Sequence, residues 1–372
     1  MVLKPVAPLI ILAVLLIGLP MLGATSTGHP ISLYLEFPLH TRYVQHAPFS
    51  WSVFMLFGTG AVFVGAASIF LYRPCLREVR SNAGRRQLPW WGWMSGFLIV
   101  CFWTLAWTRL EWFKPLQSHT FTPLWVSYVV FMNALTYRRT GRSLLTHRTR
   151  YLLSLFPASS LFWWYFEYLN SFAQNWYYVG QELFTPVGYV VNVTIAFSTV
   201  LPAVISTVEL LESYPALSQT GFRRPLVLAN PKAHAAAMLA LASCGLIGVA
   251  ASPDDWYPVL WVSPLLILVS LQMFLNEDNL LQKLQRGEWY AITVPALAAL
   301  VCGFFWEMWN TYSYPKWSYS IPYVQRFEIF EMPLLGYLGY LPFGLQCRVV
   351  ADLVARLVGS PEQSTGFNDS FR

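Results

Sequence analysis

Two glutamates in the sequence stand inside aromatic runs, and each is followed by an asparagine three residues later. The run "WWYFEYLN" contains Glu167 and Asn170, and the run "FFWEMWN" contains Glu307 and Asn310. Residues three apart lie on one face of a helix, so the two side chains of each pair point the same way. A carboxylic acid in apolar surroundings can act as a proton donor at neutral pH, and aromatic faces stabilise a cation. This combination suits proton addition to a carbon–carbon double bond, so we predict these four residues as catalytic.

Further acids and tryptophans near the same helix ends complete the predicted site. Glu111 and Asp255 precede aromatic residues in "EWFKP" and "DWYP", and Glu331 lies in the loop after the second motif. Tryptophan rings offer large contact surfaces to an apolar substrate. The predicted substrate-binding residues are Trp163, Trp164, Trp176, Trp306, Trp309, Trp317, Glu111, Asp255 and Glu331. In the simpler alternative, the acids are hydrated at the membrane interface and the rings form an ordinary aromatic belt.

The same residue types are compatible with two other chemistries. Carboxylates and amide oxygens could bind a cation in an all-oxygen shell, and acids at a membrane edge could couple protons to transport. Our leading hypothesis is a cofactor-free integral-membrane enzyme that does acid–base chemistry on an apolar isoprenoid or lipid substrate. The alternatives are a secondary transporter that uses these acids for coupling, and a structural subunit of a membrane complex.

The composition places these residues in a membrane protein. Of 372 residues, 56% are hydrophobic and 11% are charged, and the mean hydropathy is +0.45, which is unusual for a soluble domain. A helix needs about 20 mostly apolar residues to cross the hydrocarbon core. Ten segments meet this requirement, near 6–23, 51–71, 92–109, 121–137, 151–170, 187–211, 234–252, 258–275, 289–309 and 331–355. The first also has features of a cleaved signal peptide, but we favour an uncleaved helix.

The basic residues are distributed as a membrane topology requires. With the N-terminus in the cytoplasm, most of the 24 lysines and arginines fall on the inner side, as the positive-inside rule demands. The net charge of +6 is therefore a topology signal and not a nucleic-acid-binding surface. The exceptions on the outer side are Arg42, Arg109, Lys114, Lys316 and Arg326.

We therefore predict a multi-pass protein of a bacterial cytoplasmic membrane with both termini inside. A reporter that is active only outside should work when fused at position 180 or 320 and stay silent at position 145. The opposite pattern would contradict the predicted orientation.

The two acidic motifs belong to a longer internal repeat. Glu167 aligns with Glu307, and Asn170 with Asn310, at an offset of 140 residues, and Leu-Pro pairs at 201 and 341 keep this offset. The repeat covers four helices, and because four is even, both copies run the same way and pack about an axis along the membrane normal. The predicted fold is an all-α polytopic transmembrane bundle of about ten helices, with a two-helix prefix (1–89, outer loop 24–50), two parallel four-helix repeats (90–230 and 231–358) and a polar disordered tail (359–372).

No cofactor and no metal are expected from the motifs. Phosphate-binding, dinucleotide-binding and nucleophile-elbow patterns are absent from the sequence, and the five cysteines lack the spacing of zinc, haem or iron–sulfur ligands. Four outer histidines (His29, His40, His46 and His119) also lack metal-binding spacing. The expected partner is a membrane lipid or isoprenoid substrate, with a membrane protein or a second copy of the chain as alternatives and no nucleic acid.

One known family has a similar arrangement of residues. The aromatic helices that end in an acid, the following "WSY" and the segment "FEIFEMPLLGYLGYLPF" over 327–343 resemble the integral-membrane lycopene cyclases and related carotenoid hydratases, over about half of the chain. The resemblance implies a duplicated helical bundle that does acid–base chemistry on a double bond. The family's proline followed by adjacent glutamates and a phenylalanine pair is missing, because Glu331 precedes Pro333 and "LLGY" follows. No catalytic residue is therefore carried over, and the motifs as a whole look more like another bacterial multi-pass membrane family.

Overall fold

The computed structural model describes residues 6–39, 41–78, 86–218 and 225–359. Regular structure in this part of the chain is nearly all helical, which confirms the predicted all-α class. Five of the described helices are long and apolar enough to cross a membrane, or seven if each of two sharply bent helix pairs counts as one span. The chain is therefore a multi-pass helical membrane protein, and the total of ten spans stays a prediction.

The two predicted repeats contain their elements in nearly the same order. Three helices precede them: α1 (Val6–Ser26), α2 (Ser32–Leu35) and α3 (Trp51–Glu78). The first predicted repeat contains α4 (Trp90–Trp107), η1 (Glu111–His119), α5 (Phe121–Thr140), α6 (Leu144–His147), α7 (Thr149–Ala173), β1 (Trp176–Val179), η2 (Gln181–Leu183), α8 (Pro186–Phe197), α9 (Val200–Glu212) and α10 (Pro215–Ser218). The second contains α11 (Pro231–Ala251), α12 (Pro253–Trp256), η3 (Tyr257–Trp261), α13 (Ser263–Phe274), α14 (Leu280–Gln285), α15 (Tyr290–Asn310), β2 (Lys316–Tyr319), β3 (Glu328–Ile329), β4 (Met332–Pro333), η4 (Leu334–Gly339) and α16 (Tyr340–Leu357).

Two α-helices begin later than the apolar runs that predicted them. The run 187–211 is divided between α8 and α9, and the run 331–355 becomes α-helical only at Tyr340. Pro202 and Pro342 are each the third residue of their helix, α9 and α16. Proline is tolerated in the first turn of an α-helix, where its missing N–H would have no helical partner. Prolines 140 residues apart thus occupy the first turn of two corresponding helices.

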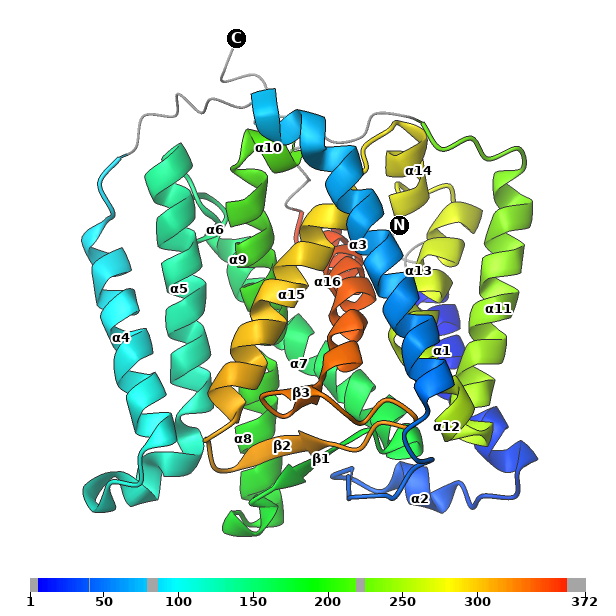
Figure 1. The fold of residues 1–372 in the computed structure, drawn as a ribbon, viewed down its shortest axis with the longest axis horizontal. Helices are drawn as coiled ribbons and strands as arrows, with labels where there is room; N and C mark the ends of the chain where they lie inside the picture. Colours follow the sequence, from blue (N-terminus) through cyan, green and yellow to red (C-terminus); the bar gives the residue numbers. More distant parts are fainter. Residues whose placement is uncertain (1–5, 40, 79–85, 219–224, 360–372) are drawn as a thin grey trace.

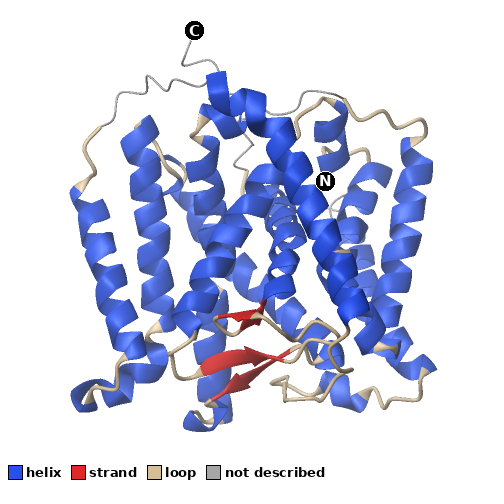
Figure 2. Cartoon of the chain, viewed as in Figure 1, coloured by secondary structure: helices blue, strands red, loops and turns tan. Residues whose placement is uncertain are grey.

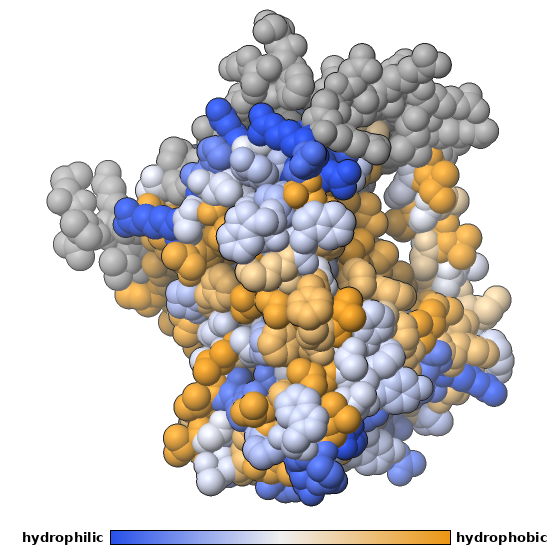
Figure 3. All heavy atoms as spheres, turned by 90° about the vertical axis from the view of Figure 1, so that its left-hand side faces the viewer, coloured by the Kyte–Doolittle hydropathy of each residue, from blue (hydrophilic) through white to orange (hydrophobic). Residues whose placement is uncertain are grey.

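The connecting segments gather at the two ends of the bundle. In Figure 1, α2, α12 and the strands lie at the lower end, whereas α6, α10 and α14 lie at the upper end. Figure 2 shows the strands confined to that one end. On the side shown in Figure 3, a band of hydrophobic residues separates more hydrophilic ends, as expected for a protein embedded in a bilayer. The loops predicted to lie outside thus share one end, and the loops predicted to lie inside share the other.

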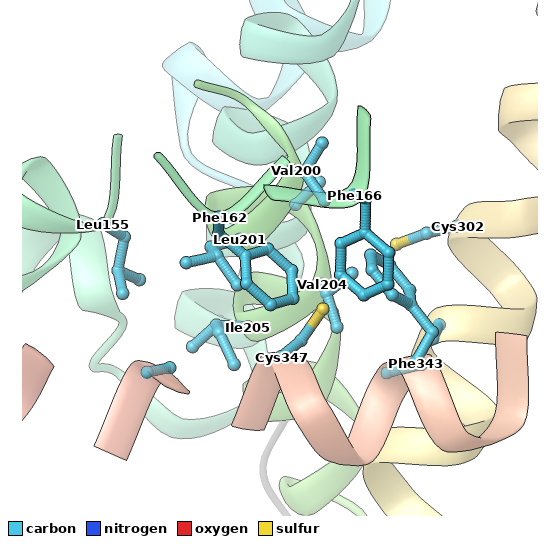
Figure 4. Packing of buried hydrophobic residues seen from close by; sticks show 14 of the residues in the cluster. Leu155, Phe162, Phe166, Val200, Leu201, Val204, Ile205, Cys302, Phe343 and Cys347 are labelled. Carbon is cyan, nitrogen blue, oxygen red and sulfur yellow. The ribbon is translucent and has the colours of Figure 1, made fainter. Parts of the chain in front are cut away.

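The centre of the bundle is built by α7 and α9 from the first predicted repeat and α15 and α16 from the second. Phe162 of α7 stacks on Phe343 of α16, with ring centroids 5.7 Å apart. Cys302 and Cys347 are fully buried beside these rings and are free thiols (Figure 4). The main hydrophobic core therefore lies between the predicted repeats, and these two cysteines contribute to its packing.

A two-stranded ribbon crosses one end of the bundle. Strands β1 and β2 pair antiparallel, with Trp176 opposite Tyr319, Tyr178 opposite Trp317, and Tyr177 opposite Ser318 between them. Each strand thus has a tryptophan followed two residues later by a tyrosine, and each tryptophan faces the other strand's tyrosine. A two-fold axis through the central pair would exchange the strands, so this register is the one that two equivalent halves would form.

The outer loop contributes a strap that joins the two predicted repeats. The His46 ring has Nδ1 2.5 Å from Oδ1 of Asp254, and its Nε2 lies 3.2 Å from the carbonyl oxygen of Gln174. The Ala47 N–H donates to the other carboxylate oxygen of Asp254 at 2.8 Å. Part of the predicted outer loop 24–50 therefore lies across this end of the bundle as a lid.

The ribbon register predicts a specific cross-link. In a chain whose natural cysteines are replaced by alanine, Tyr177→Cys with Ser318→Cys should form a disulfide on mild oxidation, because directly opposed Cβ atoms lie within about 5.5 Å. Reactivity with a thiol-alkylating reagent before and after reduction measures the bond. The matched pair Val179→Cys with Ser318→Cys is displaced by two residues and should cross-link far less. Equal cross-linking of the two pairs would contradict the register.

Candidate functional site

The Glu167 carboxylate is buried and accepts hydrogen bonds from aromatic side chains only. Its side chain is in α7, and the residue is 3% exposed. Its Oε1 accepts from Nε1 of Trp163 at 2.9 Å, from Nε1 of Trp176 at 3.1 Å and from the hydroxyl of Tyr178 at 2.5 Å. Three donors on one oxygen compensate a carboxylate that is largely withdrawn from water. The hydrated-interface alternative is therefore wrong for this acid.

The Glu307 carboxylate has a corresponding environment in α15. The residue is fully buried, and its Oε1 accepts from the hydroxyls of Tyr319 and Tyr340, both at 2.6 Å. Nε1 of Trp317 donates to the Tyr319 hydroxyl at 2.9 Å and so extends the network. The second carboxylate oxygen, Oε2, is buried and has no hydrogen-bond partner in the described part of the chain. The hydrated-interface alternative fails here too.

Besides the strand residues, each glutamate has one donor from a helix, and the two halves use different helices for it. This donor is Trp163 of α7 for Glu167 and Tyr340 of α16 for Glu307. At the position of Trp163, the second half has Gly303, and a Cβ added to this glycine would lie 2.5 Å from the Tyr340 ring. The missing side chain at Gly303 therefore leaves room for Tyr340, which reaches Glu307 from α16. The residue at the corresponding position of the first half is Val200, which has no donor. Each carboxylate thus has a third aromatic residue beside it, which is Trp163 for Glu167 and Tyr340 for Glu307.

Asn170 and Asn310 hold the start of the two strands. Nδ2 of Asn170 donates to the carbonyl of Trp176 at 2.7 Å, and Nδ2 of Asn310 donates to that of Trp317 at 2.7 Å. Their Oδ1 atoms accept from the backbone N–H groups of the same tryptophans at 3.3 and 3.0 Å. The predicted amide ligands of a cation are therefore already bonded to the backbone. The geometry gives these asparagines a positioning role, which orients each tryptophan and tyrosine toward its glutamate.

A cavity of about 160 Å³ lies beside the ribbon and next to both networks. A cavity of about 150 Å³ is large enough for a benzene ring. Twelve of its 28 described lining residues are aromatic, and Lys316 is the one lysine or arginine among them. Of the predicted residues, those that line it are Trp163, Trp176, Trp306, Trp309, Trp317 and Asn310. The structure thus brings five of the six predicted tryptophans together around one ring-sized space.

The other predicted residues lie away from this cavity. The Trp164 indole N–H donates to Oγ1 of Thr194 at 2.9 Å. Glu111 is exposed, and Asp255 is exposed and accepts from the Tyr323 hydroxyl at 3.1 Å, so the interfacial alternative describes both acids. Glu331 pairs with Lys316 at 2.6 Å. Glu167 and Glu307 themselves stand behind the aromatic wall and are not among its lining residues.

The residues that connect the carboxylates to the cavity were not among the predicted site residues. These are the tyrosines that donate to the glutamates and also line the cavity, Tyr178, Tyr319 and Tyr340, together with Trp261 of the shared aromatic wall. The signal for the first two was readable, because a tryptophan is followed two residues later by a tyrosine in both halves of the sequence. Tyr340 comes from a helix start that only the fold brings to Glu307.

The arrangement is suited to proton movement between a buried acid and the cavity. Burial raises the pKa of Tyr178 and of Tyr319 well above the ordinary tyrosine value, so both hydroxyls keep their proton and donate it. Each hydroxyl oxygen retains lone pairs that can accept from a ligand. Among the described residues, no group of three or more His, Cys, Asp or Glu side chains could hold a metal ion. The hydroxyl and carboxyl groups next to the cavity can donate and accept protons.

Comparisons with family models, with curated proteins and with solved structures found no match for this chain. The resemblance to lycopene cyclases consequently stays an expectation from the motifs.

The asparagine contacts predict a loss of stability without them. Replacement of Asn310 by alanine leaves a backbone N–H and a backbone carbonyl of Trp317 without their partner. We expect the free energy of unfolding to fall by about 2 kcal/mol, and Asn170→Ala should behave alike. Thermal unfolding of the purified protein in detergent measures the effect.

The matched control is Gln45→Ala, which removes an exposed amide and should change stability by less than about 0.5 kcal/mol. Asparagine variants as stable as this control would contradict the positioning role.

Proposed function

We propose that this chain binds an apolar isoprenoid or lipid molecule in the aromatic cavity and carries out acid–base chemistry on it without a cofactor. One observation carries the proposal: tyrosines that line the cavity donate their hydroxyl protons to two buried carboxylates. A purely structural aromatic belt does not require buried acids, whose desolvation costs several kcal/mol unless it is compensated.

The size and lining of the cavity favour a ring or a branched hydrocarbon end. About 160 Å³ accepts one six-membered ring with its substituents and excludes a whole polyene. Tryptophan and tyrosine faces contact such a group over a large area and stabilise positive charge on it. The rest of a long substrate would extend into the surrounding lipid. The expected reacting group is therefore the end of an isoprenoid or lipid chain.

The tyrosine hydroxyls can relay a proton in either direction. In the acid direction, protonated Glu307 gives its proton to the Tyr340 oxygen while the Tyr340 hydroxyl proton adds to a substrate double bond. This step leaves a carboxylate and a substrate cation beside the aromatic wall. In the base direction, the Tyr340 oxygen accepts a proton from an adjacent substrate carbon as its own proton returns to Glu307. The net result is an isomer of the substrate, or its hydrate when water captures the cation.

We further propose that the two halves, 90–230 and 231–358, arose by duplication and are related by an axis along the membrane normal. The shared element order, the paired prolines, the Asn–strand contacts and the symmetric ribbon register support this relationship. The acidic networks then lie at the outer end of a bacterial cytoplasmic membrane protein with both termini inside, as the charge distribution predicts.

The test of the proposed reaction is Glu307→Gln. Glutamine keeps the size of the side chain and an oxygen for the tyrosines but cannot take up or release the proton. We expect the purified variant to bind the proposed apolar molecule as well as the unmodified protein does and to lose at least 100-fold in turnover, because removal of a general acid typically costs about 10²–10⁴-fold. Mass spectrometry of lipid extracts, incubated without any ion gradient, would detect an isomerised or hydrated product.

Three variants control this experiment. Glu36→Gln changes an exposed acid and should leave turnover unchanged. Ala196→Trp fills the cavity and should release the apolar molecule, whereas Ala237→Trp, on an exposed face of α11, should retain it. Full turnover by Glu307→Gln would overturn the acid–base role. Gradient-dependent movement of a polar solute, with no product, would instead support a transporter.

A further inference from the structure

A second cavity adjoins the first and shares part of its lining. Its volume is about 220 Å³, and it is formed by η3, η4, the end of β2 and the following loop. The two cavities share lining residues, namely Trp176, Trp261, Tyr319, Met332, Gly336 and Gly339. The two cavities thus adjoin each other beside the ribbon.

One polar side chain in this second cavity is unsatisfied. Asn175 lines the cavity and is 4% exposed, and its Oδ1 is buried without a hydrogen-bond partner in the described part of the chain. The backbone of Asn175 is fully engaged, because its N–H donates to Asn170 and its carbonyl accepts from Ser320. A buried carbonyl oxygen that lacks a donor is rare in folded proteins. This oxygen can therefore take a donor, and the residue that carries it lines the cavity.

We propose that this second cavity binds an apolar molecule with one hydroxyl group, such as an isoprenoid alcohol, whose hydroxyl donates to Oδ1 of Asn175. The remaining lining is aromatic and aliphatic, and includes Phe57, Leu335 and Leu338, which suits a hydrocarbon body. The lining contains no lysine, arginine, aspartate or glutamate among the described residues, which disfavours a charged lipid headgroup. Binding here requires no reaction in the first cavity.

The position of α3 gives such a ligand a path from the lipid. Phe57 is the residue of α3 that lines the cavity, and no residue of 51–69 is buried. In Figure 1, α3 crosses in front of α15 and α16 as a separate diagonal helix. A helix with so little buried surface can be displaced at low cost, since few apolar contacts hold it. The ligand would pass between α3 and η4.

The test uses a photoreactive isoprenoid alcohol that carries a diazirine, and the same hydrocarbon with a methyl group in place of the hydroxyl. The full-length protein in lipid nanodiscs is irradiated with each probe, and labelled peptides are mapped by mass spectrometry. We expect the alcohol to label the segments around Phe57 and Leu338 about tenfold more than the hydrocarbon does, because it alone satisfies Asn175. Asn175→Leu should reduce labelling by the alcohol to the hydrocarbon level, and Asn175→Asp, which keeps an acceptor, should retain it.

The control Asn192→Leu changes an asparagine that lines the first cavity and should leave labelling of the second unchanged. Leu338→Trp fills the second cavity and should abolish labelling there even if Asn175→Leu folds poorly. Equal labelling by both probes, or full labelling of either Asn175→Leu or Leu338→Trp, would overturn the proposal. Turnover in the first cavity is measured separately, so a failure of either idea is distinguishable from a failure of the other.

Discussion

The hydrogen bonds from aromatic donors to two buried carboxylates constrain the end of the bundle that carries the strands. A carboxylate removed from water costs several kcal/mol unless donors surround it, so Glu167 and Glu307 require indole and hydroxyl groups close by. Those donors come from the helix, from the following strand and, for Glu307, from the start of α16. The two strands must therefore fold back over the helix ends. Their pairing forms the ribbon that contributes lining residues to both cavities.

The asparagines fix the position of each strand where it folds back over its helix, so that its aromatic donors reach the carboxylate. Asn170 and Asn310 each bond both the N–H and the carbonyl of the tryptophan that begins the donor segment. Since the tryptophan and the tyrosine two residues later lie on the same side of a strand, one fixed residue orients both toward the glutamate. A positioning amide and a buried acid three residues apart are thus one device, present in each half.

The two halves have different side chains beside their glutamates and in the nearby cavities. Trp163 fills the space beside Glu167, whereas Gly303 leaves the corresponding space to Tyr340. The second network consequently ties α15 to α16, and its tyrosine also forms part of the wall of the first cavity. The second cavity is lined by Asn175, whose Oδ1 has no hydrogen-bond partner in the described part of the chain. Two corresponding networks with different inner residues are in this way compatible with two cavities of different polarity.

The sequence by itself determined the all-α membrane class, because hydropathy and helix length depend only on local composition. It also identified Glu167 and Glu307 as unusual, since acids within aromatic runs are costly, and it placed five cavity tryptophans near them. It did not separate Trp164, Glu111 and Asp255 from the site, because a helix or loop residue can face lipid, water or core. Only the tertiary structure showed that the carboxylates accept from tyrosine hydroxyls behind the cavity wall. Tyr340 is 33 residues from Glu307 in the sequence and reaches it because α15 and α16 pack together. Contacts of this kind depend on helix orientation, which no local pattern specifies.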